Sequence, residues 1–294
     1  MDRSAWQIAA DQFPQGAPQE EQSRFLLRYA ILAPSSHNTQ PWKFSLEGTR
    51  ILIFTDPERW LKVADAEQRE LHISAGCALA NLKLAAQRFG FRTETAYHPE
   101  ADGDLAATVE LSCAAEVAGS LTETLFPLIT ARHTNRDHYD GKEVDPQSLV
   151  ALRDCAGVGG AEGVWVTDRE AIERLGELVE KGDALQFAEP AYRKELADWM
   201  RQGVFGQPAL AAKSLAFLIS HADVGHQQGE TEKKLIQSAS AFGVLGVETV
   251  DKVSQIKLGE AYETLALTAA KLGLALQPMN QGLTEVPAHL EELR

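Results

Sequence analysis

The sequence predicts an α+β protein built from two related halves. Residues 43–55 have the alternation and the central turn of a β-hairpin, and apolar residues recur at helical spacing through much of the remaining chain. One helical segment occurs twice, at 76–90 and 259–273, with glycine at both ends of each copy. Such a repeat indicates a duplicated unit, so we expect a first half at 1–120 and a second at 121–294.

The composition is that of an ordinary globular protein. The 294 residues are 44% apolar and 24% charged, and a chain of this length can bury a large core. The net charge of −14, with scattered basic residues, would repel a nucleic-acid backbone, so we exclude nucleic acid as a partner. The chain lacks an apolar run of about 18 residues and a secretion signal at its N-terminus, and its three cysteines are far apart. We therefore expect a soluble, cytoplasmic protein with no membrane partner.

The elements of the first half follow from local helix and strand signals. A helix over 24–33 ends at Pro34, because proline disfavours helical geometry in the residue before it and offers no amide donor. The other expected elements of this half are strands at 43–46, 50–55 and 106–111 and a long helix at 69–90 that ends in glycine.

The second half is expected to be mainly helical. Its predicted elements are helices near Leu125 and at 146–155, 169–181, 192–201 and 257–272, and one strand at 239–247. Residues 202–232 form a looser stretch that carries glycines, prolines and an apolar patch at 215–219. We interpret this stretch as a lid or as an excursion from the fold.

The repeated helix indicates how the two halves could meet. Six positions are identical at a displacement of 183: Gly76, Ala78, Leu82, Leu84, Ala86 and Gly90 match Gly259, Ala261, Leu265, Leu267, Ala269 and Gly273. Small residues on one face let two helices approach closely, while the leucines fill the space around them. The two copies could therefore pack together as the interface helices of a homodimer do.

A polar loop follows the first helix. The run Ala33-Pro-Ser-Ser-His-Asn-Thr-Gln-Pro-Trp42 supplies hydroxyl and amide groups that donate and accept, on a loop braced by two prolines and anchored by Trp42. This composition suits a ligand with many polar atoms. The alternative is that serine and asparagine only cap the hairpin and that Trp42 belongs to the core.

A second polar motif lies at Arg132-His-Thr-Asn-Arg136. In an extended segment the two guanidinium groups and the hydroxyl of Thr134 point to the same side. Arginine offers fixed, paired donors and keeps its charge, so this arrangement suits a phosphate group. The alternative is a solvated basic turn that neutralises part of the acidic surface.

Together the motifs resemble the nitroreductase family. The family's Pro-Ser-Ser-x-Asn-x-Gln-Pro-Trp loop is intact at 34–42, and Arg132, Thr134 and Arg136 fall on its basic, hydroxyl and basic positions. The chain is most similar to the duplicated, single-chain, Acg-like branch. The further matching motifs are Asp-Pro-x-Arg-x-Leu at 56–61, Arg-Glu-Leu-x-Ile-Ser-x-Gly at 69–76 and Arg-x-Thr-Asn-Arg at 132–136.

The resemblance implies a fold and a cofactor site. The expected fold is a three-layer α/β/α sandwich with an antiparallel-rich sheet, arranged as an internal pseudo-dimer. One FMN site per chain is expected, because each half carries one of the two motifs, and the second site should be degenerate. The residues expected to bind FMN are Pro34, Ser35, Ser36, Asn38 and Gln40 from the first half and Arg132, Thr134 and Arg136 from the second.

The function implied is that of an FMN-dependent oxidoreductase, in which NAD(P)H is the reductant and a nitroaromatic, quinone or similar small molecule is the acceptor. Because the flavin carries the chemistry, we assign no catalytic side chain, and the histidines have no usual metal spacing. Two alternatives stay open: a flavin-binding or flavin-sequestering protein closed by a lid at 202–232, and a stress-response protein with an empty site. The acceptor, the choice between NADH and NADPH, and self-association of the pseudo-dimeric monomer also stay open.

Overall fold

The computed structural model describes residues 4–98, 103–114, 119–157, 160–222 and 224–280. The N-terminal half contains a four-stranded sheet and two main helices. Its elements in chain order are the 3₁₀ helices η1 (Ser4–Trp6) and η2 (Ala10–Gln12), α1 (Gln19–Ala30), η3 (Ser36–Asn38), β1 (Trp42–Glu47), β2 (Arg50–Thr55), α2 (Arg69–Arg88), β3 (Phe91–Tyr97) and β4 (Leu105–Cys113).

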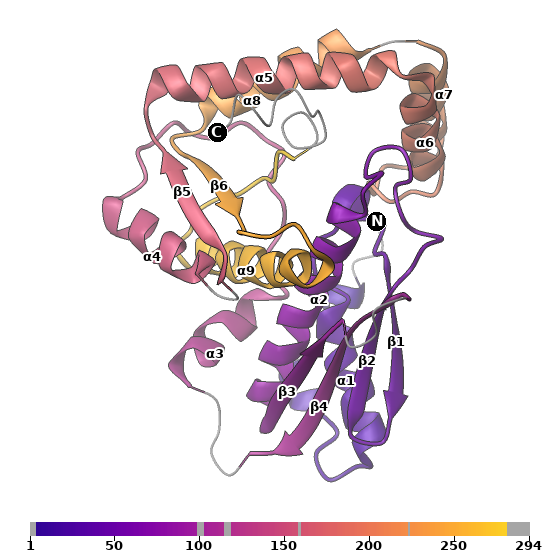
Figure 1. Ribbon diagram of the computed structural model, residues 1–294, viewed down its shortest axis with the longest axis vertical. Coiled ribbons are helices and arrows are strands. Elements are labelled where there is room, and N and C mark those ends of the chain that lie inside the picture. Colours follow the sequence, from indigo (N-terminus) through magenta and orange to yellow (C-terminus); the bar gives the residue numbers. More distant parts are fainter. Residues whose placement is uncertain (1–3, 99–102, 115–118, 158–159, 223, 281–294) are drawn as a thin grey trace.

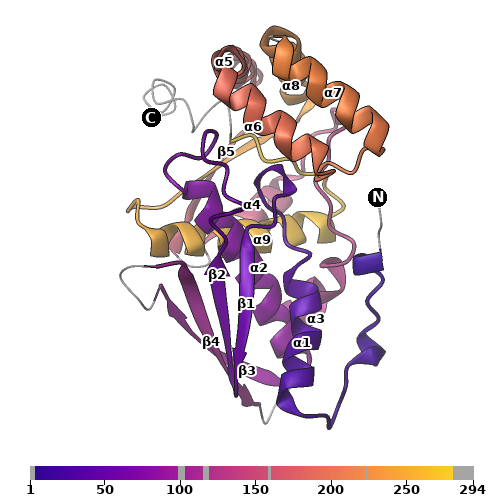
Figure 2. The same cartoon turned by 90° about the vertical axis from the view of Figure 1, so that its right-hand side faces the viewer.

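The sheet of this half has the strand order β1-β2-β4-β3, and each neighbouring pair is antiparallel. One face packs on α1 and α2, so that sheet and helices form two layers (Figure 2). Ile51, Ile53 and Val109 point into this core and are fully buried, as the alternation of side chains along a strand requires. On the other face Lys43 and Glu94 are exposed. The antiparallel sheet is therefore present, whereas no third layer is seen on this face in the described residues.

The second half is mainly helical. Its elements are α3 (Ser120–Leu125), η4 (Phe126–Leu128), α4 (Pro146–Ala156), β5 (Glu162–Val166), α5 (Arg169–Ala188), α6 (Pro190–Arg201), α7 (Ala209–His221), α8 (Gly225–Ser238), β6 (Phe242–Gly246) and α9 (Lys252–Lys271). Strands β5 and β6 pair antiparallel in a separate two-stranded sheet. The four helices α5–α8 lie between these two strands in sequence and form a helical layer at one end of the molecule (Figure 1).

The two copies of the repeated helix, α2 and α9, pack against each other as expected (Figure 1). Their contact is closest at the two glycines. A Cβ on Gly76 would lie 1.9 Å from the carbonyl oxygen of Ile256, and a Cβ on Gly259 would lie 2.0 Å from that of Ile73. The contact is reciprocal at the same displacement of 183, and a two-fold relation produces such exchange.

Several elements differ from the sequence-based expectation. Residues 202–232 are not loose, because α7 and most of α8 lie within them. The glycines that suggested a loop allow close packing instead: a Cβ on Gly229 would lie 2.8 Å from the Glu180 carbonyl oxygen of α5. Strands β3 and β5 were not predicted, since β3 is rich in polar residues and β5 contains a glycine.

None of the helices in the described part of the chain has the length and apolar character needed to cross a membrane.

The glycine contact gives a direct test. We expect Gly76→Ala and Gly259→Ala to lower the free energy of unfolding by about 1–3 kcal/mol or more, because the added methyl group forces two helix backbones apart. Helix propensity alone predicts the opposite sign. The matched control is Gly176→Ala on α5, where the nearest atom is the flexible Lys233 side chain at 3.3 Å. Chemical denaturation of the three variants measures the difference, and neutral Gly76 and Gly259 variants would contradict the packing.

Candidate functional site

The polar loop between α1 and β1 has an unusual backbone. His37, Asn38 and Gln40 have φ angles of 50°, 52° and 51°, in the left-handed region that non-glycine residues rarely adopt. Such conformations cost about 1–3 kcal/mol each and persist only where the surroundings hold them in place. The loop must therefore be fixed by contacts with the rest of the protein.

The side chains of the loop make part of these contacts. Ser35 Oγ accepts a hydrogen bond from the Gln40 amide at 2.9 Å. Ser36 Oγ donates to Glu70 on α2 at 2.8 Å, and Asn38 Nδ2 donates to the carbonyl oxygen of Val204 at 2.7 Å. Trp42 is buried against Ala33 and α2. Capping and anchoring, the structural alternative for this motif, thus describe Ser35 and Trp42, whereas Ser36 and Asn38 reach distant parts of the chain.

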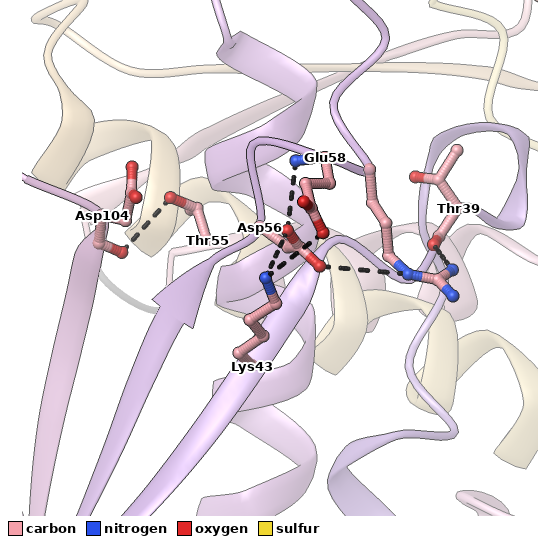
Figure 3. A network of polar contacts seen from close by, with 7 residues as sticks. Thr39, Lys43, Thr55, Asp56, Glu58 and Asp104 are labelled. Atoms are coloured by element: carbon pink, nitrogen blue, oxygen red, sulfur yellow. Dashed lines mark hydrogen bonds and ion pairs between the residues drawn. The ribbon is translucent and has the colours of Figure 1, made fainter.

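The motif at 56–61 holds the loop from the side of the sheet (Figure 3). The Asp56 carboxylate is buried and accepts from the Glu58 amide at 3.1 Å. It also pairs with Lys43 at 2.9 Å and with Arg59 at 4.0 Å. Arg59 in turn donates to the carbonyl oxygen of Thr39, inside the loop, at 2.7 Å. This network fixes the strained backbone next to Asn38 and Gln40.

Glu70 connects the loop to the C-terminal part of the described chain. Its carboxylate accepts from Ser36 and, through the other oxygen, from Asn280 Nδ2 at 2.8 Å. Burial raises the pKa of Glu70, while these two hydrogen bonds lower it. The N-terminus of α2 is held by Asp65, whose carboxylate accepts from the amides of Glu70 and Leu71 at 3.1 and 2.9 Å. Glu70 therefore positions two segments that are far apart in the sequence.

The arginine segment lies beside the same C-terminal stretch. The Asn135 amide donates to the carbonyl oxygen of Leu276 at 3.0 Å. Arg132 is buried and pairs with Glu263 of α9, with 3.5 Å between Nε and Oε1. Thr134 is half-buried and Arg136 is exposed. The three side chains predicted to act together thus lie in different environments.

His37 of the polar loop and Arg136 of the second motif lie within electrostatic range of each other. Burial, with the charge of Arg136 as the second cause, lowers the pKa of His37 to about 4. The same guanidinium lowers the pKa of Glu232 on α8, although burial raises that pKa overall. Arg136 is therefore within electrostatic range of both the polar loop and the helical layer.

The connection between α6 and α7 covers the polar loop. Val204 accepts from Asn38, and the ring of Phe205 lies 5.6 Å from that of His37. On the same side, the Glu195 carboxylate of α6 accepts from the amides of Val63 and Ala64 at 3.0–3.2 Å. Part of the stretch predicted as a lid thus contacts the candidate site.

Several residues of the site were missed by sequence reasoning. Glu70 lies within the quoted motif at 69–76, but nothing in the motif indicates its partners. Glu263 lies in the repeated helix, where its position in the first copy is occupied by Ala80. A glutamate in place of alanine at this position could have indicated that Glu263 has a role of its own. Nothing in the sequence indicated that Asn280 or Glu195 contacts the site.

Similar known proteins include proteins named "Putative NAD(P)H nitroreductase". No protein-family model matches the chain. The chain is 28% identical to "Putative NAD(P)H nitroreductase Rv3131" of Mycobacterium tuberculosis over 272 residues, which cover 90% of this chain and 78% of the relative. It is 26% identical to "Uncharacterized protein Rv3127" of the same organism over 266 residues, 85% of this chain and 76% of the relative.

A shorter match concerns "Putative NAD(P)H nitroreductase acg" of M. tuberculosis, which is 34% identical over 59 residues, 20% of this chain and 18% of that protein. These matches confirm the resemblance found in the motifs. The chain is related to the nitroreductase family through its Acg-like members.

The network around Asp56 gives a second test. We expect Asp56→Ala to lower the free energy of unfolding by about 1–3 kcal/mol, because it removes the buried acceptor of the Glu58 amide and of the Lys43 and Arg59 side chains. The matched control is Glu58→Ala. The Glu58 side chain is 87% exposed and lies 3.8 Å from Lys43, so its loss should change stability by about 0.5 kcal/mol or less. Equal effects of the two variants in urea denaturation would show that the network does not hold the loop.

The helical layer next to Arg136 contains a buried carboxyl group. Asp183 on α5 is 2% exposed, and its Oδ2 has no hydrogen-bond partner among the described residues. Burial, with the charge of Glu232 as the second cause, raises the pKa of Asp183 to about 8. Between the ordinary pKa of aspartate and this value, the folded protein holds a proton that the unfolded chain has lost, so stability falls as the pH rises through this interval.

We therefore expect the melting temperature to fall between about pH 4 and pH 8, the interval between the ordinary pKa of aspartate and that of Asp183 in the folded protein. Asp183→Asn should reduce this fall, because the amide stays neutral at every pH. Glu170→Gln is the control, since the Glu170 side chain on the same helix is 82% exposed and should keep the wild-type slope. An unchanged slope in Asp183→Asn, measured by thermal unfolding across the pH range, would contradict the assignment.

Proposed function

We propose that the chain is an NAD(P)H-dependent oxidoreductase with one FMN site, built from the polar loop at 34–40, the segment at 132–136 and the stretch at 276–280. The acceptor class is a nitroaromatic, a quinone or a similar small molecule. The observation that carries the proposal is that both motifs are tied to the same C-terminal stretch: Ser36 shares the Glu70 carboxylate with Asn280, and the Asn135 amide donates to Leu276. The resemblance assigns these motifs to the walls of one flavin site. Two of the relatives are named "Putative NAD(P)H nitroreductase", and these names support the same reaction class.

The residues present fit a flavin mononucleotide. Its ring edge offers an N–H donor and two carbonyl acceptors, and its ribityl chain ends in a phosphate. The hydroxyl and amide groups of the polar loop complement the ring edge and the ribityl chain. Gln277 Oε1 is shielded from solvent and accepts no hydrogen bond within the described part of the chain, so it is suited to an N–H donor. The segment at 132–136 supplies positive charge for a phosphate.

In this proposal the residues around FMN bind and orient it. Pro34, Ser35, Ser36, Asn38 and Gln40 form one wall, and Arg132, Thr134 and Arg136 belong to the opposite one. When bound, FMN would supply the two-electron chemistry that links NAD(P)H to the acceptor. Glu70 holds Ser36 and Asn280 at fixed positions, and Val204 and Phe205 limit the access of water.

We also propose that the two halves, 1–120 and 121–294, form an internal pseudo-dimer. In both halves an antiparallel strand pair precedes the glycine helix: β1 and β2 before α2, and β5 and β6 before α9. The turn of the first pair is replaced in the second by the helical layer α5–α8. The second half has Gly-Val-Gly-Gly-Ala at 157–161 where the first has its polar loop, which supports a single FMN site.

A second candidate function is favoured by the contact of the α6–α7 connection with the loop. Asn38 and His37 are covered by Val204 and Phe205, so a bound flavin could be held without access for a nicotinamide. The protein would then bind or sequester FMN without catalysing electron transfer from NAD(P)H.

One experiment distinguishes the two candidate functions. The protein is saturated with FMN, freed of excess, and mixed anaerobically with NADH or NADPH while the visible flavin band is followed. Bleaching faster than that of free FMN supports the oxidoreductase. A bound flavin that neither reductant bleaches supports the second candidate, and a protein that takes up no FMN contradicts both. Ser45→Ala, on the exposed side of β1, is the control that should behave as wild type.

A further inference from the structure

Helix α7, at the outer edge of the helical layer (Figure 1), is apolar on both of its faces. Its inner face packs on α6, where Ala216 and Ile219 belong to a buried apolar cluster. Elsewhere on the same helix four large apolar residues are exposed: Leu210, Leu215, Phe217 and Leu218. A helix that is apolar all round is normally buried on every side, and a contiguous exposed apolar patch marks an interaction surface. The outer face of α7 is therefore a candidate interface.

The outward residues of α7 form one continuous stripe. Successive residues of a helix are about 100° apart, so Ser214 lies on the side opposite the buried residues of α7. The residues three and four positions before and after it share its face. We call this set the outer stripe, and its members are Leu210, Ala211, Ser214, Phe217 and Leu218. The three large members, Leu210, Phe217 and Leu218, are 80%, 63% and 51% exposed.

The charge around the outer stripe favours a protein partner over a membrane. Lys213 is the single residue of α7 with a full charge, whereas 24% of the whole chain is charged. Such depletion of charge is typical of the core of a protein interface. Helices that lie on a membrane carry many lysines and arginines on their polar face, and the net charge of −14 would be repelled by anionic lipids.

The outer stripe is complementary to a second copy of itself. It is symmetric about Ser214, because Leu210 and Leu218 lie four positions to either side, and Ala211 and Phe217 lie three. When two copies of α7 cross antiparallel about a two-fold axis at Ser214, Leu210 lies opposite the partner's Leu218, and Phe217 lies opposite the partner's Ala211. Each phenylalanine ring then meets a small side chain, and the small serine at the centre lets the helices approach closely.

We propose that two copies of this chain associate through the outer stripe of α7, in a symmetric pair with Ser214 at its centre. Helices α6 and α7 have 12 and 13 residues, and only part of them faces outward, so the interface is smaller than the standard one of about 20–30 residues a side. We therefore expect a dissociation constant in the micromolar range. Association of this kind needs no flavin.

Analytical ultracentrifugation across the micromolar range measures this association. We expect Leu218→Glu to weaken it by about 100-fold or more, because the two-fold axis buries the new carboxylate on both sides of the interface. The matched control is Leu185→Glu, since Leu185 is a 58% exposed leucine on α5, outside the outer stripe. This control should associate as the wild type does.

A pair of opposite charges tests the register of the two helices. Leu210→Lys alone should weaken association as Leu218→Glu does. The double variant Leu210→Lys/Leu218→Glu places opposite charges across the two-fold axis, so it should associate about 10-fold more tightly than either single variant. Positions 210 and 218 are two helical turns apart, too far for pairing within one helix, so this recovery must come from contact between two copies.

Three results in the ultracentrifuge would overturn the inference: a wild type that stays monomeric across the range, a Leu218→Glu variant that associates as the wild type does, or a double variant no tighter than the single ones. Flotation with phosphatidylcholine vesicles adds a second measurement. A wild type that floats with the vesicles, together with a Leu218→Glu variant that does not, would assign the outer stripe to a membrane surface and overturn the inference as well.

Discussion

The close contact between Gly76 and Gly259 is the constraint on which the rest of the structure depends. Because neither residue has a Cβ, the backbones of α2 and α9 approach until a carbonyl oxygen of each helix occupies the place where the side chain of the other would lie. Glu70 precedes this contact on α2, and Glu263 follows it on α9. The first holds the polar loop and the second holds the arginine segment, so the distance between the two motifs is set by the packing of two helices.

The polar loop illustrates how a protein maintains an unfavourable local conformation. Three left-handed residues within four positions are costly, and the structure holds them from three directions. Arg59 binds the loop backbone from the sheet side, Glu70 binds Ser36 from α2, and Val204 binds Asn38 from the helical layer. A loop fixed in this way presents its hydroxyl and amide groups in a set arrangement before any ligand arrives, which lowers the entropic cost of binding.

Much of this architecture could be predicted from local patterns. The hairpin of β1 and β2, the helices α2 and α9, their packing and both site motifs leave clear periodicity or composition in the sequence. The helices at 202–232 were not predicted, because Gly225 and Gly229 were read as loop residues. In the structure these two glycines allow the close contact of α8 with α5. Local reasoning also could not separate Arg132 from Arg136, since their difference lies in the burial given to one of them by Glu263. The contact of Glu70 with Asn280 joins residues at opposite ends of the described chain, and such contacts depend on tertiary packing alone.

In the proposed function, two halves of one chain build a single flavin site. The most direct test is the amount of flavin released on denaturation of the FMN-saturated protein, divided by the amount of chain. We predict a ratio near one, because the polar loop and the arginine segment each occur once. A ratio near two would mean that each half binds its own flavin, and a ratio near zero would mean that the fold exists here without the cofactor; either result would contradict the account.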